Sequence, residues 1–243
     1  MKFKDYYDLP YAVMLAAKIG DVHPAFDQNG FAAFAKSQNL EEREFSQRQD
    51  ILARAMAQYL PDDYAAALNI LKDVLGPELA KDAGMFTEGW WLWPVGRYVT
   101  NRACENFDLS AAFIAELTKR FTGEFAMRPL LEAYPAQALN TAEAWSLDAN
   151  VHVRRLASEC LRIRLPWAKK SFVALEHFER YRRILGNLKH DASKFVQKSV
   201  ANNLNDLYKE DAAKAQSIID AWQNDAPSKA TLWIIKHAMR NQK

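Results

Sequence analysis

Two acidic residues of this sequence each follow a polar residue by four positions, a spacing that gives both side chains the same face of a helix. Arg155 precedes Glu159, and Asn202 precedes Asp206. A carboxylate held in this way can act as a general base on a water molecule, and a neighbouring arginine can orient the carboxylate or hold a phosphate. For Arg155 and Glu159, the alternative is an intrahelical salt bridge that contributes little to stability.

The elements that would carry these residues are predicted to be helices, because strand patterns are weak throughout the chain. Helical spacing of apolar residues is clearest over residues 60–76, 109–121, 212–222 and 230–240. In the first of these, Leu68, Leu71 and Leu75 share one face, and Gly76-Pro77 ends the pattern.

An internal repeat organises the helices around the two acids. Asp148-Ala149 recurs 43 residues later as Asp191-Ala192, and a weaker third copy follows at Asp225-Ala226. The same register matches Val153 with Val196, Arg155 with Lys198, Glu159 with Asn202, and Leu161 with Leu204. A period of roughly 40–47 residues is typical of HEAT-type helix pairs, which stack into a curved solenoid. A compact helical bundle is the alternative.

We therefore expect an all-α fold, a curved HEAT-like solenoid that forms a single domain over residues 1–243. Residues 1–50 would form an N-terminal helical cap, and the clearest repeats would span about 140–222. Equivalent helices of successive repeats line one face of a solenoid. One concave wall would then carry Arg155, Glu159, Lys198, Asn202 and Asp206.

The charge of the chain is distributed unevenly. Residues 151–200 contain 12 Lys and Arg against 4 Asp and Glu, a balance of +8, whereas the remainder contains 20 basic and 26 acidic residues, a balance of −6. A basic stretch on a slightly acidic body suggests a surface that faces a polyanion such as nucleic acid. The alternative is a solvated helical face that is rich in lysine.

Other patterns narrow the class of protein. The N-terminal MKFKDYYDLP has no apolar core of the kind a signal peptide needs, and no apolar run approaches the length that spans a bilayer. We therefore expect a cytoplasmic protein without a membrane partner. The five His residues are scattered and none is at ligand spacing from a Cys or another His, so we expect no metal. No other cofactor is expected.

Three segments resemble the bacterial DNA alkylation repair family that includes AlkC and AlkD, and they resemble AlkC more closely. They are LTKRFTGEFAMRPL at 117–130, NVHVRRLASECLRIRLPWAKK at 150–170, and VQKSVANNLNDLYK at 196–209, with TLWIIKHAMR near the C-terminus. The chain departs from the family pattern at Cys160, where Gly is expected, and at Ile163, where Pro is expected. Some AlkC-like proteins carry a C-terminal immunoglobulin-like domain, and we expect this chain to lack it.

The resemblance implies a DNA glycosylase of base excision repair that removes cationic N3-alkylated bases, namely 3-methyladenine and 3-methylcytosine. It also implies that the base need not be flipped fully into a pocket, unlike the usual strategy. A cationic base is already a good leaving group, so the enzyme has to stabilise the oxocarbenium-like sugar and position the attacking water. The acids in the family-like segments are Glu124, Glu159 and Asp206, and we rank Glu159 first as the catalytic carboxylate.

The resemblance also suggests which residues would contact DNA. Trp167, with neighbouring Phe125, would face the lesion, because a cationic base over an indole gains about 0.5–2 kcal/mol from cation–π attraction. The alternative for Trp167 is a place in the packed core. Candidates for binding DNA phosphates are Arg154, Arg162, Arg164, Lys169, Lys170 and Lys198, and Arg155 and Asn202 complete the DNA-binding set.

The expected partner is double-stranded DNA containing alkylated bases, bound by a monomer at the bacterial nucleoid. Two further hypotheses stay open. One is a non-catalytic HEAT-repeat protein that binds damaged or branched DNA, and the other is a HEAT scaffold for protein partners, which would present an apolar groove in place of the basic stretch.

Overall fold

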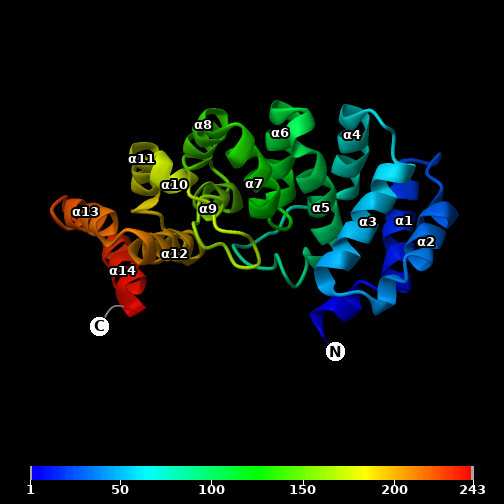
Figure 1. Cartoon of the computed structure of the whole chain (residues 1–243). Helices are drawn as coiled ribbons and strands as arrows, with labels where there is room; N and C mark the ends of the chain where they lie inside the picture. Colours follow the sequence, from blue (N-terminus) through cyan, green and yellow to red (C-terminus); the bar gives the residue numbers. More distant parts are fainter. Residues whose placement is uncertain (1, 242–243) are drawn as a thin grey trace. The chain divides into compact units, whose positions relative to one another are not determined.

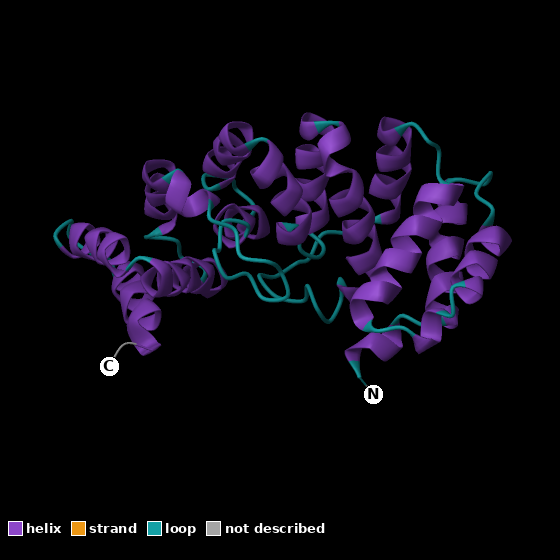
Figure 2. Ribbon diagram, in the orientation of Figure 1, coloured by secondary structure: helices purple, strands orange, loops and turns teal. Residues whose placement is uncertain are grey.

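The computed structural model describes residues 2–241, and these residues form helices and connecting loops without any strand (Figures 1 and 2). The all-α prediction is therefore confirmed. Within the same residues, no helix combines the length and the apolar character that crossing a membrane requires.

The chain forms two compact units. The first comprises Met1–Leu79 and Gly84–Phe121, and the second comprises Ala80–Ala83 and Thr122–Lys243. The expectation of a single domain over residues 1–243 stays a prediction. The residues of interest for chemistry all belong to the second unit.

The first unit is built from pairs of packed helices. Its helices are α1 (Leu9–Val22), α2 (Gln28–Ser37), α3 (Phe45–Tyr59), α4 (Tyr64–Val74), α5 (Trp93–Arg102) and α6 (Phe107–Thr118), with 3-10 helices at Phe3–Tyr6, Leu40–Glu42, Trp90–Leu92 and Ala103–Glu105. Helix α1 packs on α2 and α4, and α3 packs on α2 and α5. The helices predicted at 60–76 and 109–121 correspond to α4 and α6. The N-terminal helical cap expected over residues 1–50 stays a prediction.

The second unit consists of two layers of helices. Its helices are α7 (Glu124–Ala133), α8 (Pro135–Trp145), α9 (Val151–Glu159), α10 (Val173–Glu176), α11 (Phe178–Leu188), α12 (Lys194–Glu210), α13 (Ala212–Gln223) and α14 (Lys229–Ala238), followed by the 3-10 helix η5 (Met239–Asn241). In one layer α9 packs on α12, and α12 packs on α14. In the other layer α8 packs on α11, and α11 and α13 line one pocket together.

The repeat predicted from the sequence is visible at the starts of α9 and α12. Asp148 accepts a hydrogen bond from the backbone N–H of Asn150, whose side chain caps α9. Asp191, 43 residues later, accepts from the N–H of Ser193, whose side chain caps α12. A side-chain oxygen at the N-cap satisfies backbone N–H groups that have no partner inside the helix. The same turn therefore starts two successive helices of one layer.

Candidate active site

Three helices of the second unit, α7, α9 and α12, bring the three predicted acids together. Glu124 is the first residue of α7, Glu159 is the last residue of α9, and Asp206 lies in the C-terminal half of α12. All three are buried, with exposed fractions of 3%, 5% and 4%. Buried carboxylates require partners, because an unpaired charge away from water is very unfavourable.

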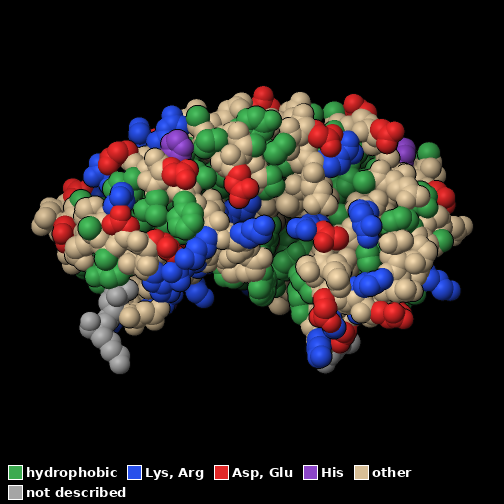
Figure 3. All heavy atoms as spheres, in the orientation of Figure 1, with side chains coloured by type: hydrophobic (Ala, Val, Ile, Leu, Met, Phe, Trp, Pro, Cys, Tyr) green, Lys and Arg blue, Asp and Glu red, His purple; other side chains and the backbone are tan. Residues whose placement is uncertain are grey.

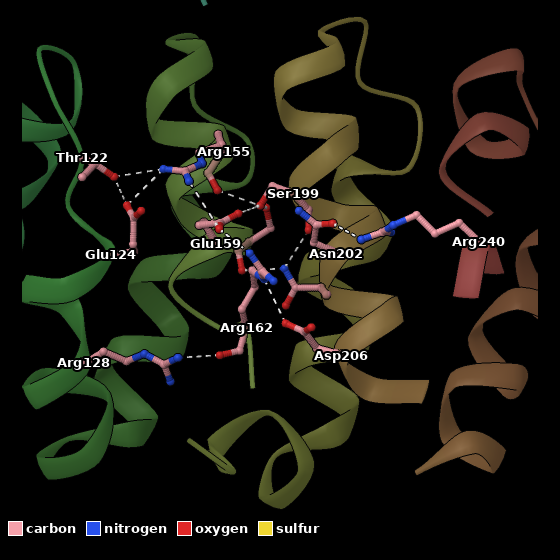
Figure 4. A network of polar contacts seen from close by, with 12 residues as sticks. Thr122, Glu124, Arg128, Arg155, Glu159, Arg162, Ser199, Asn202, Asp206 and Arg240 are labelled. Atoms are coloured by element: carbon pink, nitrogen blue, oxygen red, sulfur yellow. Dashed lines mark hydrogen bonds and ion pairs between the residues drawn. The ribbon is translucent and has the colours of Figure 1, made fainter. Parts of the chain in front are cut away.

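The partners are two arginines that alternate with the acids. The Arg155 guanidinium lies 3.0 Å from Glu124 Oε2 and 3.4 Å from Glu159 Oε1. The Arg162 guanidinium lies 2.9 Å from Glu159 Oε1 and 2.9 Å from Asp206 Oδ2 (Figure 4). We call these five residues the carboxylate–arginine network. Glu159 and Asp206 thus share the Arg162 guanidinium. The Arg155–Glu159 ion pair predicted from the spacing forms, and Arg155 also pairs with Glu124 of α7.

Glu159 is the most fully engaged of the three acids. Its Oε1 accepts a hydrogen bond from Arg162 and forms an ion pair with Arg155, and its Oε2 accepts from the Ser199 hydroxyl of α12 at 2.7 Å. Burial acts to raise the pKa of Glu159, but the charges of Arg155 and Arg162 and the hydrogen bond from Ser199 outweigh it, so its pKa lies below the ordinary range. Glu159 is therefore a fixed, ionised carboxylate at neutral pH.

Glu124 and Asp206 retain capacity to accept a further hydrogen bond. Glu124 Oε2 accepts from Thr122 and Arg155, and Asp206 Oδ2 accepts from Arg162. Their second oxygens, Glu124 Oε1 and Asp206 Oδ1, accept none from the residues that the structure describes. Each of these oxygens is available to a water molecule or to positive charge on a ligand.

Trp167 lies on the loop of residues 160–172 between α9 and α10, and its side chain is 79% exposed. The alternative of a packed core tryptophan is therefore wrong. Trp167 has a φ of 62°, a left-handed conformation that is costly for a residue with a large side chain and that persists where the surroundings fix it. Phe125, the residue after Glu124, is half-buried.

Several contacts fix the loop that carries Trp167. Arg128 of α7 donates to the backbone carbonyl of Arg162 at 2.6 Å, and the N–H of Ser171 donates to the carbonyl of Ile163 at 3.2 Å. Arg164 and Lys170 both pair with Glu210 of α12, at 2.6 and 2.8 Å. The loop is thus tied to the helices on both sides of α9.

The structure separates the predicted phosphate-binding residues into two groups. Arg154, Arg162, Arg164 and Lys170 are held in ion pairs with acids of the protein. Lys169 and Lys198 are exposed and have no hydrogen-bond or ion-pair partner among residues 2–241. Asn202 is half-buried, and its Oδ1 accepts from Arg240 at 2.9 Å.

Sequence reasoning did not identify Arg128, Ser199 or Arg240 as part of the site. Arg128 and Ser199 lie inside the segments that carried the resemblance, but neither is an acid or a residue on the predicted wall. Cys160 and Ile163, the two departures from the family pattern, are fully buried at 0% exposed. Burial raises the pKa of the Cys160 thiol to about 12, so this residue fills space as a neutral thiol.

The arrangement is a set of fixed carboxylates without the residues of a metal centre. Within the described part of the chain, no group of three or more His, Cys, Asp and Glu side chains could hold a metal ion. Ionised carboxylates in a buried setting can stabilise positive charge that develops on a ligand and can position a water molecule.

Two known proteins are similar to this chain over nearly its whole length. The uncharacterized protein YhaZ of Bacillus subtilis (strain 168) is 32% identical over 237 residues, which cover 98% of this chain and 63% of YhaZ. The Pseudomonas fluorescens alkylpurine DNA glycosylase AlkC, solved bound to DNA containing an abasic site analog, is 32% identical with a TM-score of 0.87. That match covers 99% of this chain and 64% of the AlkC chain, and it confirms the helical repeat fold.

The chain therefore spans slightly less than two thirds of the length of either relative. The family model of the DNA alkylation repair enzymes matches residues 38–241, a range that contains the whole carboxylate–arginine network. This chain belongs to the DNA alkylation repair enzyme family.

Proposed function

We propose that this chain is a monofunctional DNA glycosylase that hydrolyses the N-glycosidic bond of cationic N3-alkylated bases, such as 3-methyladenine and 3-methylcytosine. The observation that carries the proposal is the carboxylate–arginine network, which joins acids from α7, α9 and α12 in a member of the DNA alkylation repair enzyme family. The similarity to AlkC, an alkylpurine DNA glycosylase, supports the same reaction.

The chemistry follows from the charge of the substrate. An N3-alkylated base leaves without being protonated, so no general acid is required. As the glycosidic bond stretches, positive charge grows on the deoxyribose, and a nearby carboxylate stabilises it. Asp206 and Glu124 each have an oxygen free to face this sugar or the attacking water, while Glu159 holds both arginines in place.

Trp167 would recognise the lesion. An exposed indole on a fixed loop can lie against a cationic base, and the cation–π attraction is weaker for an undamaged, neutral base. This contact favours damage without requiring the base to enter a deep pocket. Phe125, next to Glu124 at the start of α7, would border the same base.

The partner would be double-stranded DNA, bound by a monomer through its phosphates. Among the phosphate contacts predicted from the sequence, Lys169 and Lys198 are the strongest candidates because the protein itself does not neutralise them. Chromosomal DNA as the substrate would place the protein at the bacterial nucleoid.

The test is to incubate the protein with methylated DNA and to identify the released bases by mass spectrometry. We expect free 3-methyladenine or 3-methylcytosine, and a loss of release of about 100-fold or more in Glu159→Gln and in Asp206→Asn, with binding to DNA kept. Two acids are tested because Glu159→Gln removes a buried charge and can lower stability, whereas Asp206 has fewer partners.

Glu179→Gln is the matched control, since Glu179 is an exposed acid of α11 whose ion pair with Arg182 lies outside the network. It should release bases as the parent does. A parent protein that binds damaged or branched DNA but releases no base would favour the non-catalytic DNA-binding alternative.

A further inference from the structure

Helices α12 and α14 meet along a line of side chains that the proposed reaction does not use. Lys194 Nζ lies 4.2 Å from the centre of the Trp233 ring, and the Trp233 and His237 rings stack at 4.8 Å with 8° between their planes. At the other end, Arg240 donates to Asn202 Oδ1 at 2.9 Å. We call this line, together with exposed Lys198, the α12–α14 seam.

The seam contains cations and no acid. Residues 194–205 include Lys194 and Lys198 but neither Asp nor Glu, and residues 229–241 include three basic residues and again no acid. Elsewhere in this unit the cations are mostly paired, as Arg154 is with Asp191. Figure 3 shows Lys and Arg side chains gathered over α12 on the displayed face.

Such a cluster is electrostatically unfavourable in the absence of an anion. Partial burial, followed by the charges of Arg240 and Lys198, holds the pKa of the His237 imidazole below its ordinary value. Lysine and arginine side chains offer only donors and positive charge, and a neutral imidazole beside them can donate through one of its two ring nitrogens, so the cluster fits a ligand that supplies negative charge.

The spacing of the seam fits a polymer of phosphates. Lys194, Lys198 and Asn202 follow one another at intervals of one helical turn, so they extend over about 12 Å at a rise of about 1.5 Å per residue. One strand of duplex DNA presents a phosphate every ~3.4 Å along the axis, so this length faces about three phosphates. Asp206 follows Asn202 by four residues, and its side chain turns away from α14 to pair with Arg162.

We propose that the α12–α14 seam binds the sugar–phosphate backbone of the strand that carries the damaged base, immediately beside the deoxyribose that faces Asp206. The location of that deoxyribose rests on the proposed function. The phosphate-binding residues assigned by the seam are Lys194, Lys198, His237 and Arg240, of which only Lys198 is predicted from the sequence.

The test measures binding of Lys198→Ala and Arg240→Ala to an undamaged duplex by fluorescence anisotropy at several salt concentrations. Each lost phosphate contact should make the negative slope of log K against log [salt] less steep by about 0.9, and loss of both in the double variant by about 1.8. The weakening should be greatest at low salt. Lys198 has no partner in the described protein, so its replacement should leave the fold intact.

Arg183→Ala is the matched control, because Arg183 is an exposed arginine of α11 in the other layer and its removal changes the charge equally. Its slope and its base release should equal those of the parent. Slopes for Lys198→Ala and Arg240→Ala that equal the control would overturn the proposal. Binding is measured with undamaged DNA and does not depend on base release. A parent protein that releases no base from methylated DNA would therefore contradict the proposed glycosylase function, but it would not contradict phosphate binding by the seam.

Discussion

Glu159, the acid ranked first from the sequence, occupies the centre of the network, where each of its oxygens already has a partner. A carboxylate between two guanidinium groups keeps its charge and its position, but it has little capacity left for a water molecule. Asp206 has an oxygen without such a partner among the described residues. For the proposed reaction, the geometry therefore favours a division of roles in which Glu159 fixes the arginines and Asp206 faces the reacting sugar.

The ionisation of Glu159 leads to a prediction about pH. A carboxylate with a lowered pKa is charged at and above the ordinary value of about 4.3 and loses its charge only as the pH falls below it. In the proposed reaction the leaving base is already cationic and needs no general acid. Single-turnover release at saturating protein should therefore stay constant from pH 8 down to about pH 5, after subtraction of the spontaneous release measured without protein. A rate that falls as the pH rises toward 8 would instead indicate a required general acid.

The residues of the site differ in how far the sequence could locate them. Spacing alone pairs Arg155 with Glu159, because the two lie on one helix. Nothing in the sequence places Arg162 between Glu159 and Asp206, since that bridge depends on how α9 packs against α12. The exposure of Trp167 likewise follows from the loop conformation, which local sequence patterns do not determine.

At the scale of elements, the turns that precede α9 and α12 explain why Arg154, a predicted phosphate-binding residue, is held by contacts within the protein. Arg154 donates to the carbonyls of Asp148 and Ala149 in its own turn. Gln197, its equivalent 43 residues later, donates in the same way to the carbonyl of Asp191. Arg154 therefore binds the carbonyls of its own turn, as Gln197 does in the next repeat, and its guanidinium also forms an ion pair with Asp191 of that repeat.

This role predicts the effect of replacing Asp191. Asp191→Ala removes the acceptor for the Ser193 N–H and the ion pair with Arg154, whose N···O distance is 2.6 Å. The free energy of unfolding should fall by about 1–3 kcal/mol, measured by urea denaturation. Asp148→Ala is the control, since Asp148 makes the equivalent turn bond and the structure shows no ion pair for it among the described residues. Its loss should be smaller, and equal losses would mean that the ion pair contributes nothing.

The boundaries of the helices show what patterning can and cannot supply. The apolar spacing that predicted a helix over 60–76 identified the correct face, but α4 begins at Tyr64 because the Asp63 side chain caps it by accepting from the Ala66 N–H. The helix predicted at 230–240 is α14 followed by a 3-10 turn. Periodicity locates the buried face, whereas caps and turns set the ends.

Over the whole molecule, the net charge of +2 conceals a division between the two units. The second unit contains 20 basic and 14 acidic residues, and the first contains 12 basic and 16 acidic residues. The unit that holds the carboxylate–arginine network is therefore the one that attracts a polyanion. Counting charges along the sequence detects this excess, but only the structure shows which cations are already paired.

This division predicts how the protein binds duplexes of different sequence. Contacts to phosphates fix position without reading bases, so an A·T-rich and a G·C-rich duplex of equal length should bind within about threefold of each other at every salt concentration, with equal slopes. Lys72→Ala, in the acidic first unit, should leave the slope unchanged, because Lys72 is exposed on α4 outside the basic unit. Anisotropy titrations check both outcomes. A tenfold preference for either duplex would mean that the protein reads base edges or groove width, which conflicts with the proposed function of finding damage in any sequence context.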